Sequence, residues 1–403
     1  MNAFKDCLPA VILVCLSSAH AANDGAPAAV ADLPGGVADV PLHVYNNLLV
    51  VDVAVNGGET RPFILDTGAG GTLIATGVVA AGAAEGEEPI TVAGVSGTQE
   101  FAAARLDTLA LGEAVLRGPV VACGDLSPLS RLLGFDIAGI LGYDFLKNFV
   151  VKVDYDAARL TLYTPAAFGD GAGVDFIPAT YGSGNPLVEM AVDDVSGKFV
   201  VDLGNPGAML LNGAVVRERD LVNKAGAKLP AVLRGAGGDK GTEAWVVRMG
   251  EVRIGDHALA GPIVVLPTTE NAILTCGEDV MGNVGWDLAS RFVLYFDYPG
   301  GRLGLVPGAR FGAPFDYDRA GLVLLPAGDG CYVVDKVASF SPAAALLTPG
   351  DRVVGINGEA AADVPAPEWG RIRSQPAGTP LTLTVERADG RREEVTFALA
   401  ELL

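Results

Sequence analysis

The stretch FILDTGAGGTLI, residues Phe63–Ile74, decides the fold of this chain. Three apolar residues lead into Asp66, and Thr67 and a run of glycines follow. This order predicts a buried strand that ends on a carboxylate, followed by a tight turn that glycine allows close to the acid. A similar stretch, FVVDLGNPGAMLL, occupies Phe199–Leu211 and carries Asp202 after its apolar run.

An internal repeat connects the two stretches. AGILGYDFLKNFVVKVDYDAARLTLYTP, residues 138–165, matches GNVGWDLASRFVLYFDYPGGRLGLVP, residues 282–307, feature by feature. The central glycines of these blocks stand 143 residues apart, and the two acids that follow the apolar runs stand 136 apart. Each copy has short alternating strands joined by glycine and asparagine turns, so the repeat predicts two homologous, mainly β units.

Four further acids fall at matched places in the repeat. Asp144 and Asp287 begin short helix-like segments, and we expect them to cap those helices. Asp154 and Asp297 begin the segments DYDAARL and DYPGGRL, which predict hairpin turns.

Length and charge narrow the class of protein. A chain of 403 residues predicts two or three domains, and the high hydrophobic content predicts a folded protein. The net charge of −20 argues against a nucleic-acid partner, which needs basic surface, and against binding to anionic membranes. No segment after the N-terminus is long and apolar enough to predict a stable membrane span.

The N-terminus has the features of a secretory signal. Lys5 precedes the apolar run Leu8–Leu16, and Ala19–Ala21 is a small-x-small cleavage site. We expect a signal peptide at residues 1–21 and a flexible leader at residues 22–40, and therefore an exported protein, periplasmic or secreted.

The sequence gives little basis for metal, cofactor or nucleophile chemistry. Removal of the signal would leave Cys123, Cys276 and Cys331, which are too sparse for a zinc site or a disulfide framework. Whether Cys123 and Cys276 pair is left open. The three histidines are scattered, and no glycine loop has a nucleotide-binding pattern, so we expect neither metal nor cofactor.

A pseudo-twofold axis between the repeats would bring Asp66 and Asp202 together. Two carboxylates at hydrogen-bonding distance cannot both ionise, so one keeps a proton while the other stays charged. Such a pair can activate a water molecule and protonate a carbonyl or a leaving amine.

The same residues resemble the retropepsin-like aspartic proteases. Asp66-Thr67-Gly68-Ala69 is similar to the family's Asp-Thr-Gly loop, and Ile140-Leu141-Gly142 is similar to the apolar element beneath it. The counterparts in the second copy are Asp202-Leu203-Gly204-Asn205 and Asn283-Val284-Gly285.

The resemblance implies a pseudo-twofold bilobal β unit with lobes at residues 41–165 and 166–312. It also implies a catalytic dyad of Asp66 and Asp202, and flap-like hairpins near residues 94–97 and 235–238. The active-site loop residues would be Thr67, Gly68, Ala69, Leu203, Gly204 and Asn205.

Leu203 departs from the family pattern, which places Thr or Ser there. That hydroxyl links the two loops in the family, and leucine can neither donate nor accept. We expect Thr67 to bond to the backbone of the second lobe, and Asn205 to supply a polar group.

Residues 313–403 form a third, unrelated unit. Its segments SPAA, GDRVV and ING, from Ser341 to Gly358, resemble a bacterial PDZ domain, with an Asn-Gly hairpin. By resemblance, a C-terminal peptide ligand would bind near Gly321, Leu322 and Val323.

These features predict an exported aspartic-type endopeptidase that acts on peptide or protein substrates. Leu203 motivates an alternative, a peptide-binding protein with a protease fold and no turnover. In a further alternative, activity arises when first lobes of two chains pair as a homodimer.

Overall fold

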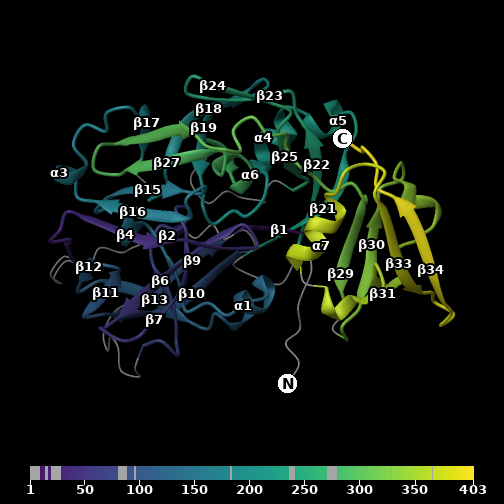
Figure 1. Cartoon of the computed structure of the whole chain (residues 1–403), viewed down its shortest axis with the longest axis horizontal. Coiled ribbons are helices and arrows are strands. Elements are labelled where there is room, and N and C mark those ends of the chain that lie inside the picture. Colours follow the sequence, from purple (N-terminus) through teal and green to yellow (C-terminus); the bar gives the residue numbers. More distant parts are fainter. Residues whose placement is uncertain are drawn as a thin grey trace.

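The computed structural model describes residues 10–13, 17–19, 29–79, 89–94, 97–181, 184–235, 241–269, 279–327, 329–364 and 366–403. Over these residues the protein is mainly β, as the repeat predicted, and its strands form three sheets. Figure 1 shows the first half of the repeat (purple to blue) against the second half (teal to green), with the C-terminal unit (yellow) to one side.

The sheet of the first half has the order β2-β9-β10-β13-β8-β14-β7-β6-β11-β12-β3, with β5 paired to β6. Its strands are β2 (Ser17–Ala19), β3 (Val30–Asp32), β5 (His43–Tyr45), β6 (Leu48–Val55), β7 (Thr60–Leu65), β8 (Leu73–Ala75), β9 (Ile90–Gly94), β10 (Gly97–Arg105), β11 (Thr108–Leu111), β12 (Ala114–Arg117), β13 (Val120–Gly124) and β14 (Gly139–Leu141).

The second sheet runs β1-β21-β22-β25-β20-β26-β19-β18-β17-β28-β27-β15-β16-β4, with β23 and β24 beside β18. Its strands are β1 (Ala10–Leu13), β4 (Val37–Pro41), β15 (Val150–Asp154), β16 (Arg159–Tyr163), β17 (Asp175–Thr180), β18 (Leu187–Val192), β19 (Val195–Val201), β20 (Met209–Leu211), β21 (Leu229–Gly235), β22 (Thr242–Arg248), β23 (Glu251–Ile254), β24 (His257–Ala260), β25 (Ile263–Pro267), β26 (Val280–Val284), β27 (Phe292–Asp297) and β28 (Arg302–Pro307).

The third sheet has the order β29-β30-β31-β33-β34. It contains β29 (Leu322–Pro326), β30 (Tyr332–Val337), β31 (Arg352–Ile356), β32 (Glu359–Ala360), β33 (Pro380–Glu386) and β34 (Arg392–Ala398). The α-helices are α1 (Ser127–Leu133), α2 (Tyr143–Leu146), α3 (Pro165–Phe168), α4 (Gly213–Glu218), α5 (Leu221–Lys224), α6 (Trp286–Ala289) and α7 (Ala366–Arg373), and 3-10 turns lie at Pro342–Ala345 and Ala361–Asp363. No described helix is both long and apolar enough to span a bilayer.

The two halves arrange their matched strands in the same way. In the first half, β14 lies between β7 and β8, parallel to β7 and antiparallel to β8. In the second half, β26 lies between β19 and β20 with the same directions. The strands β7 and β19, which carry the two apolar runs, are buried where they approach their acids. This burial on both faces explains why their apolar residues do not alternate with polar ones.

The halves join within the second sheet, toward the end that carries β4. Strand β15 of the first half pairs with β27 of the second half in antiparallel register, Val150 opposite Asp297. The hairpin turns predicted at Asp154 and Asp297 are present: Ala157 N–H donates to Asp154 at 3.0 Å, and Gly300 N–H donates to Asp297 at 2.8 Å. One hydrophobic cluster continues through both halves because their inner sheets share this junction.

Part of the expected flexible leader is wrong, because residues within 22–40 form strands. β3 pairs with β12, and β4 pairs with β16. Ala38 and Val40 are buried in the main cluster, and Asp39 on the opposite face pairs with Arg159. Strand β4 has a short alternation of buried and exposed residues, but the surrounding alanine, glycine and proline residues are more typical of a flexible segment.

The expected helix caps are also corrected. Gly142 and Gly285 occupy the N-cap positions of α2 and α6, while Asp144 and Asp287 lie in the first helical turn. A Cβ on either glycine would overlap the backbone of the preceding loop, at Gly71 and Gly207 respectively. The close packing of helix on loop therefore requires glycine at the cap, and this displaces the acid by two positions.

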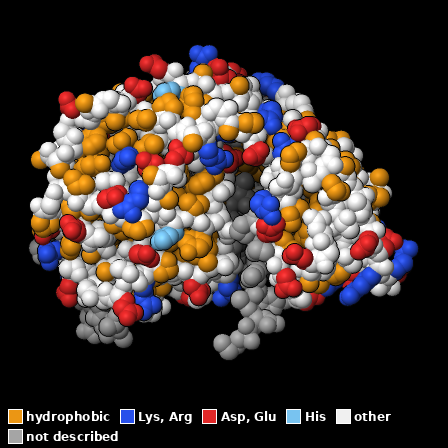
Figure 2. All heavy atoms as spheres, in the orientation of Figure 1, with side chains coloured by type: hydrophobic (Ala, Val, Ile, Leu, Met, Phe, Trp, Pro, Cys, Tyr) orange, Lys and Arg blue, Asp and Glu red, His pale blue; other side chains and the backbone are white. Residues whose placement is uncertain are grey.

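The C-terminal unit has its own hydrophobic cluster around Trp369. The predicted Asn-Gly hairpin is present between β31 and β32, with positive φ at Asn357 and Gly358. On the face drawn in Figure 2, acidic and basic side chains are interspersed over both parts of the molecule. An ion pair between Lys336 of β30 and Glu243 of β22 connects the unit to the second half.

Candidate active site

The two acid-bearing loops leave their strands through matched hydrogen bonds. Asp66 N–H donates to the carbonyl oxygen of Leu141 at 3.1 Å. Asp202 N–H donates to the carbonyl oxygen of Val284 at 3.0 Å. Each acid therefore starts its turn at the end of a strand that is held on both sides by buried neighbours.

The loops bring the two carboxyl groups together, as the repeat predicted. A Cβ placed on Gly68 would lie under 3.0 Å from the carboxyl atoms of Asp202, and one on Gly204 would overlap the carboxyl of Asp66. Each carboxyl therefore packs against the glycine of the opposite loop. Both acids are fully buried within the chain. Glycine is required at these two places because no side chain fits between acid and loop.

Backbone amides hold each carboxyl in the same way. Gly68 N–H donates to Asp66 Oδ1 at 2.7 Å, and Gly204 N–H donates to Asp202 Oδ1 at 2.8 Å. Burial and the neighbouring charge of Asp202 raise the pKa of Asp66 well above its ordinary value. Burial and mutual repulsion therefore favour a single negative charge on the pair, because they oppose the second ionisation.

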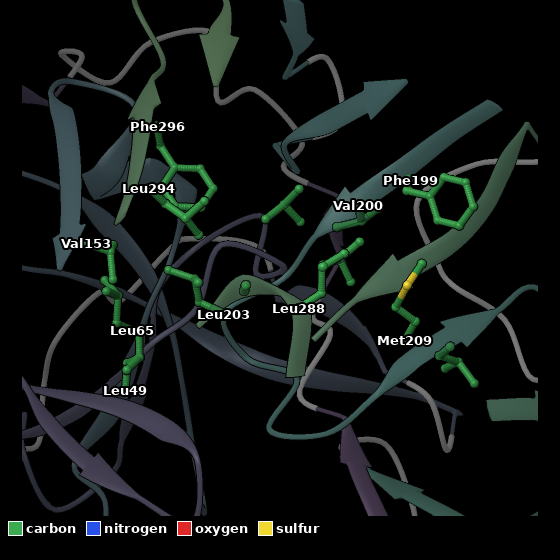
Figure 3. Packing of buried hydrophobic residues seen from close by; sticks show 14 of the residues in the cluster. Leu49, Leu65, Val153, Phe199, Val200, Leu203, Met209, Leu288, Leu294 and Phe296 are labelled. Carbon is green, nitrogen blue, oxygen red and sulfur yellow. The ribbon is translucent and has the colours of Figure 1, made fainter. Parts of the chain in front are cut away.

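Thr67 reaches across to the second loop, as expected. Its hydroxyl donates to the carbonyl oxygen of Val201 at 2.7 Å and accepts from Leu203 N–H at 3.0 Å. Leu203 has no equivalent link: its side chain is buried in the main cluster with Leu65 and Leu288 (Figure 3). Thr67 alone thus ties the two loops by a hydroxyl, whereas the second loop contributes apolar packing.

Asn205 supplies a polar group, but it does not contact the dyad directly. Its amide donates to the side-chain oxygen of Asn283 at 2.8 Å, and Asn283 in turn donates to Asp202 Oδ2 at 2.6 Å. Asn283 is a site residue that was not predicted from the sequence. A signal was present, because a polar residue stands there in an otherwise apolar triplet that matches Ile140-Leu141-Gly142.

Two more asparagines support the loops from the opposite half. Asn185 is buried, and its amide donates to the carbonyl oxygen of Gly68 at 2.5 Å. Asn47 donates to the carbonyl oxygen of Pro206 at 3.1 Å. Sequence reasoning missed both residues, since each lies just before a strand that has no motif. Their common feature is a place just before β6 or β18, the strands that pair with the acid-bearing strands β7 and β19.

Three tyrosines lie near the first loop. The ring of Tyr298 is 4.5 Å from that of Tyr181 and 5.7 Å from that of Tyr143, measured between centroids. Burial is the main cause that raises the pKa of Tyr298, and the charge of Asp66 adds to it. The phenol of Tyr298 is therefore neutral at physiological pH, and the three rings form an aromatic cluster beside the first loop.

Other predicted residues stand apart from the dyad or outside the described structure. Ala69 is buried and its carbonyl oxygen accepts from Tyr143 N–H at 2.9 Å, so it anchors α2 to the loop. Strands β9 and β10 pair up to Gly94 and Gly97, but the tips of both expected flaps include residues outside the described ranges. Cys276 also lies outside them, and Cys123 is a free, half-buried thiol. Among the described residues, no three His, Cys, Asp or Glu side chains form a group suited to a metal ion.

In the C-terminal unit, Gly321 has a positive φ of 69° and leads into β29. Leu322 and Val323 are buried at 1% exposure. β29 is an edge strand of its sheet, and it lies near β21 of the second half.

Comparisons with known proteins found one family model and distant structural similarities. A family model described as "Aspartyl protease" matches residues 51–145, which include the first loop and the start of α2. A solved aspartic proteinase from Irpex lacteus is 14% identical, with 70% of this chain and 100% of that chain covered at a TM-score of 0.45. Basic 7S globulin from soybean is 11% identical, with 69% and 97% covered at a TM-score of 0.41. No curated protein matches the sequence.

Proposed function

We propose that the chain is an aspartic-type endopeptidase in which Asp66 and Asp202 activate water for peptide hydrolysis. The observation that carries this proposal is the pair of buried carboxyls, each held by its own loop amide and packed on the glycine of the opposite loop. The match of residues 51–145 to an aspartyl protease family model supports the same reaction class.

The arrangement suits a reaction without a covalent intermediate. The ionised carboxylate takes a proton from water while the water oxygen bonds to the peptide carbonyl carbon. The protonated carboxyl gives its proton to the carbonyl oxygen, so a neutral diol forms. In the second step the C–N bond breaks, the amine leaves with the proton taken from water, and the proton given to the oxygen returns. One proton thus moves each way, and the dyad regains its starting state.

The edges of strands β21 and β9 favour an extended peptide as the substrate. Residues 10–13 of the chain add to the edge of β21 as a parallel strand, and residues 17–19 add to the edge of β9 as an antiparallel strand. Both edges therefore accept strand addition from an extended segment, which is a common way to bind peptides. The same pairing is compatible with the proposed signal peptide, whose removal would free these edges.

The C-terminal unit is proposed to be a PDZ domain that binds peptide termini at Gly321, Leu322 and Val323. Gly321 begins the end strand of its sheet with a positive φ, a conformation that favours glycine. Fluorescence anisotropy with peptides that carry a free or an amidated C-terminus tests this role. Equal binding of both peptides would contradict carboxylate capture.

The proposed location is outside the cytoplasm, after cleavage behind Ala21. Mass spectrometry of the protein recovered from cells would then find Ala22 as the first residue. An intact N-terminus on an otherwise active protein would contradict export by this route.

The central experiment measures hydrolysis of a mixed peptide library from acid to neutral pH. Wild type, Asp66→Asn and Asp202→Asn are compared, with Asp107→Asn as a matched control because Asp107 is exposed and remote from the loops. We expect cleavage by wild type and the control, and none by either dyad variant. Loss in Asp66→Asn alone would favour a homodimer of first halves.

Leu203 supports a second candidate, a peptide-binding protein without turnover. The second loop lacks the hydroxyl that the first loop uses to cross between halves. This candidate predicts that wild type binds extended peptides, cuts none at any pH, and binds equally well as Asp202→Asn.

A further inference from the structure

We infer that Asn283 is a positioning residue for the dyad: its buried side-chain amide holds the Asp202 carboxylate, favours the ionised form of that acid, and leaves the shared proton on Asp66. The inference rests on the proposed function and deepens it, because it assigns the two roles. Asp202 becomes the base that takes a proton from water, and Asp66 becomes the acid. Asn283 Nδ2 donates to Asp202 Oδ2 at 2.6 Å, and both side chains are fully buried.

The direction of this amide is set by a chain of hydrogen bonds that begins at the backbone. Gly207 N–H donates to Asn205 Oδ1 at 2.9 Å, so the opposite atom of that amide must be the nitrogen. Asn205 Nδ2 donates to the carbonyl oxygen of Ala208 at 3.1 Å and to Asn283 Oδ1 at 2.8 Å. The nitrogen of Asn283 therefore faces Asp202, and a flipped amide would break two of these contacts.

The first half has no equivalent of this chain. Ala69 stands where the second half has Asn205, and Ile140 stands where it has Asn283; both are buried in an apolar cluster. Asp66 Oδ2 is buried and has no hydrogen-bond partner among the described residues. Asp202 thus receives a side-chain amide donor on Oδ2 in addition to its loop amide, whereas Asp66 is held by the amides of its own loop, Gly68 and Ala69.

This difference decides where the negative charge rests. A hydrogen bond to an ionised acceptor is stronger than one to a neutral acceptor, so the added side-chain donor of Asn283 favours charge on Asp202. The groups that act on Asp66 are its own loop amides, Asp202, and the neutral phenol of Tyr298. Burial and the charge of Asp202 raise the pKa of Asp66, which agrees with the proton resting there.

The test replaces Asn283 by leucine, which has a similar shape and no donor. Asn212→Leu is the matched control, because the amide of Asn212 donates to Val280 at the start of the same strand, away from the dyad. The protein is labelled with ¹³C on the aspartate carboxyl carbons, and the dyad signals are identified by their loss in Asp66→Asn and Asp202→Asn.

We expect the pair to titrate in two steps, and the lower step to rise by about one to two pH units in Asn283→Leu. The acid limb of the pH profile of kcat/KM should shift to higher pH by the same amount. Asn212→Leu should change neither the lower titration step nor this limb. If Asn283→Leu does not fold, Asn283→Ser, whose hydroxyl is too short to reach Asp202, gives the same reading.

If a folded Asn283 variant still hydrolyses peptides and shows unchanged titration steps and an unchanged acid limb of kcat/KM, the inference is wrong. The proposed function would remain. Suppose that Asn283→Leu raises the lower titration step, but the wild-type protein cleaves no peptide. The positioning role would then stand, and the proposed function would be wrong. The NMR titration therefore separates the two failures, because it needs no turnover.

Discussion

Thr67 and Leu203 occupy the same place in their loops, yet they bond in one direction only: the Thr67 hydroxyl accepts from the Leu203 N–H at 3.0 Å. The same hydroxyl donates to Val201, so one side chain closes a two-bond bridge between the halves. The Leu203 side chain turns into the hydrophobic cluster instead. The interface at the dyad is therefore half polar and half apolar.

Removal of this bridge should weaken both stability and activity. In Thr67→Val the buried Leu203 N–H and Val201 carbonyl lose their partner, which costs about 1–3 kcal/mol of unfolding free energy. Urea unfolding measures the loss, and Thr60→Val, an exposed change in β7, the strand that leads into this loop, serves as control. Equal stability of the two variants would mean that the bridge contributes nothing.

Neutralising the dyad should stabilise the fold above acid pH. Folding raises the pKa of Asp66, so the stability linked to its protonation is fully present below the ordinary pKa of about 3.9 and is lost as pH rises through the folded value. Asp66→Asn removes that loss. We expect its melting temperature to exceed that of wild type at pH 7 and to converge with it near pH 3.

A melting temperature for Asp66→Asn that stays below wild type at every pH would contradict this reading. It would show that the carboxyl is held by contacts that an amide cannot replace. The exposed Asp107→Asn serves as the control for the change of residue type.

The fold could be predicted from the sequence because its decisive features are repeated and local. The apolar runs before Asp66 and Asp202 required buried strands, and the glycines after them required close packing of loop on carboxyl. The Asp-Tyr turns at Asp154 and Asp297 also followed from residue type alone. Because the pattern occurs twice, the structure predicted for one copy could be checked against the other copy.

The supporting residues could not be predicted because their roles depend on contacts between distant segments. Asn185 lies 117 residues from the carbonyl that it holds, and nothing near it in sequence marks that contact. Strand β4 was hidden for a related reason: its burial comes from pairing with β16 more than a hundred residues later. Local propensity carries no information about such partners.

Asn185 and Asn47 offer a matched pair of cross-half contacts. Asn185→Ala should lower the unfolding free energy by about 1–3 kcal/mol, because its buried amide leaves the Gly68 carbonyl unpaired. Asn47→Ala should cost less, since its contact with Pro206 is exposed and water can replace it. Chemical denaturation of both variants gives the comparison. A larger effect for Asn47 would mean that burial does not set the strength of these contacts.

The matched acids Asp144 and Asp287 differ in their surroundings, and this difference predicts a pH effect. Thr72 donates to Asp144 Oδ1 at 2.6 Å, whereas Ala208 stands at the equivalent place in the second half and can donate nothing. Burial raises the pKa of Asp287 to about 6, although Arg310 and Arg291 oppose the shift and Asp316 adds to it.

Asp287→Asn should therefore stabilise the protein at neutral pH and not in acid. The folded pKa lies above the ordinary value, so this group contributes stability below about pH 4 and loses it as pH rises through about 6. We expect a gain of about 1–2 kcal/mol at pH 7 and none at pH 4, measured by urea unfolding at both values. Asp144→Asn, which weakens the acceptor that Thr72 uses, should give no such gain. If wild type and Asp287→Asn keep the same pH slope between 4 and 7, Asp287 is already ionised in the folded protein and the missing threonine has no electrostatic consequence.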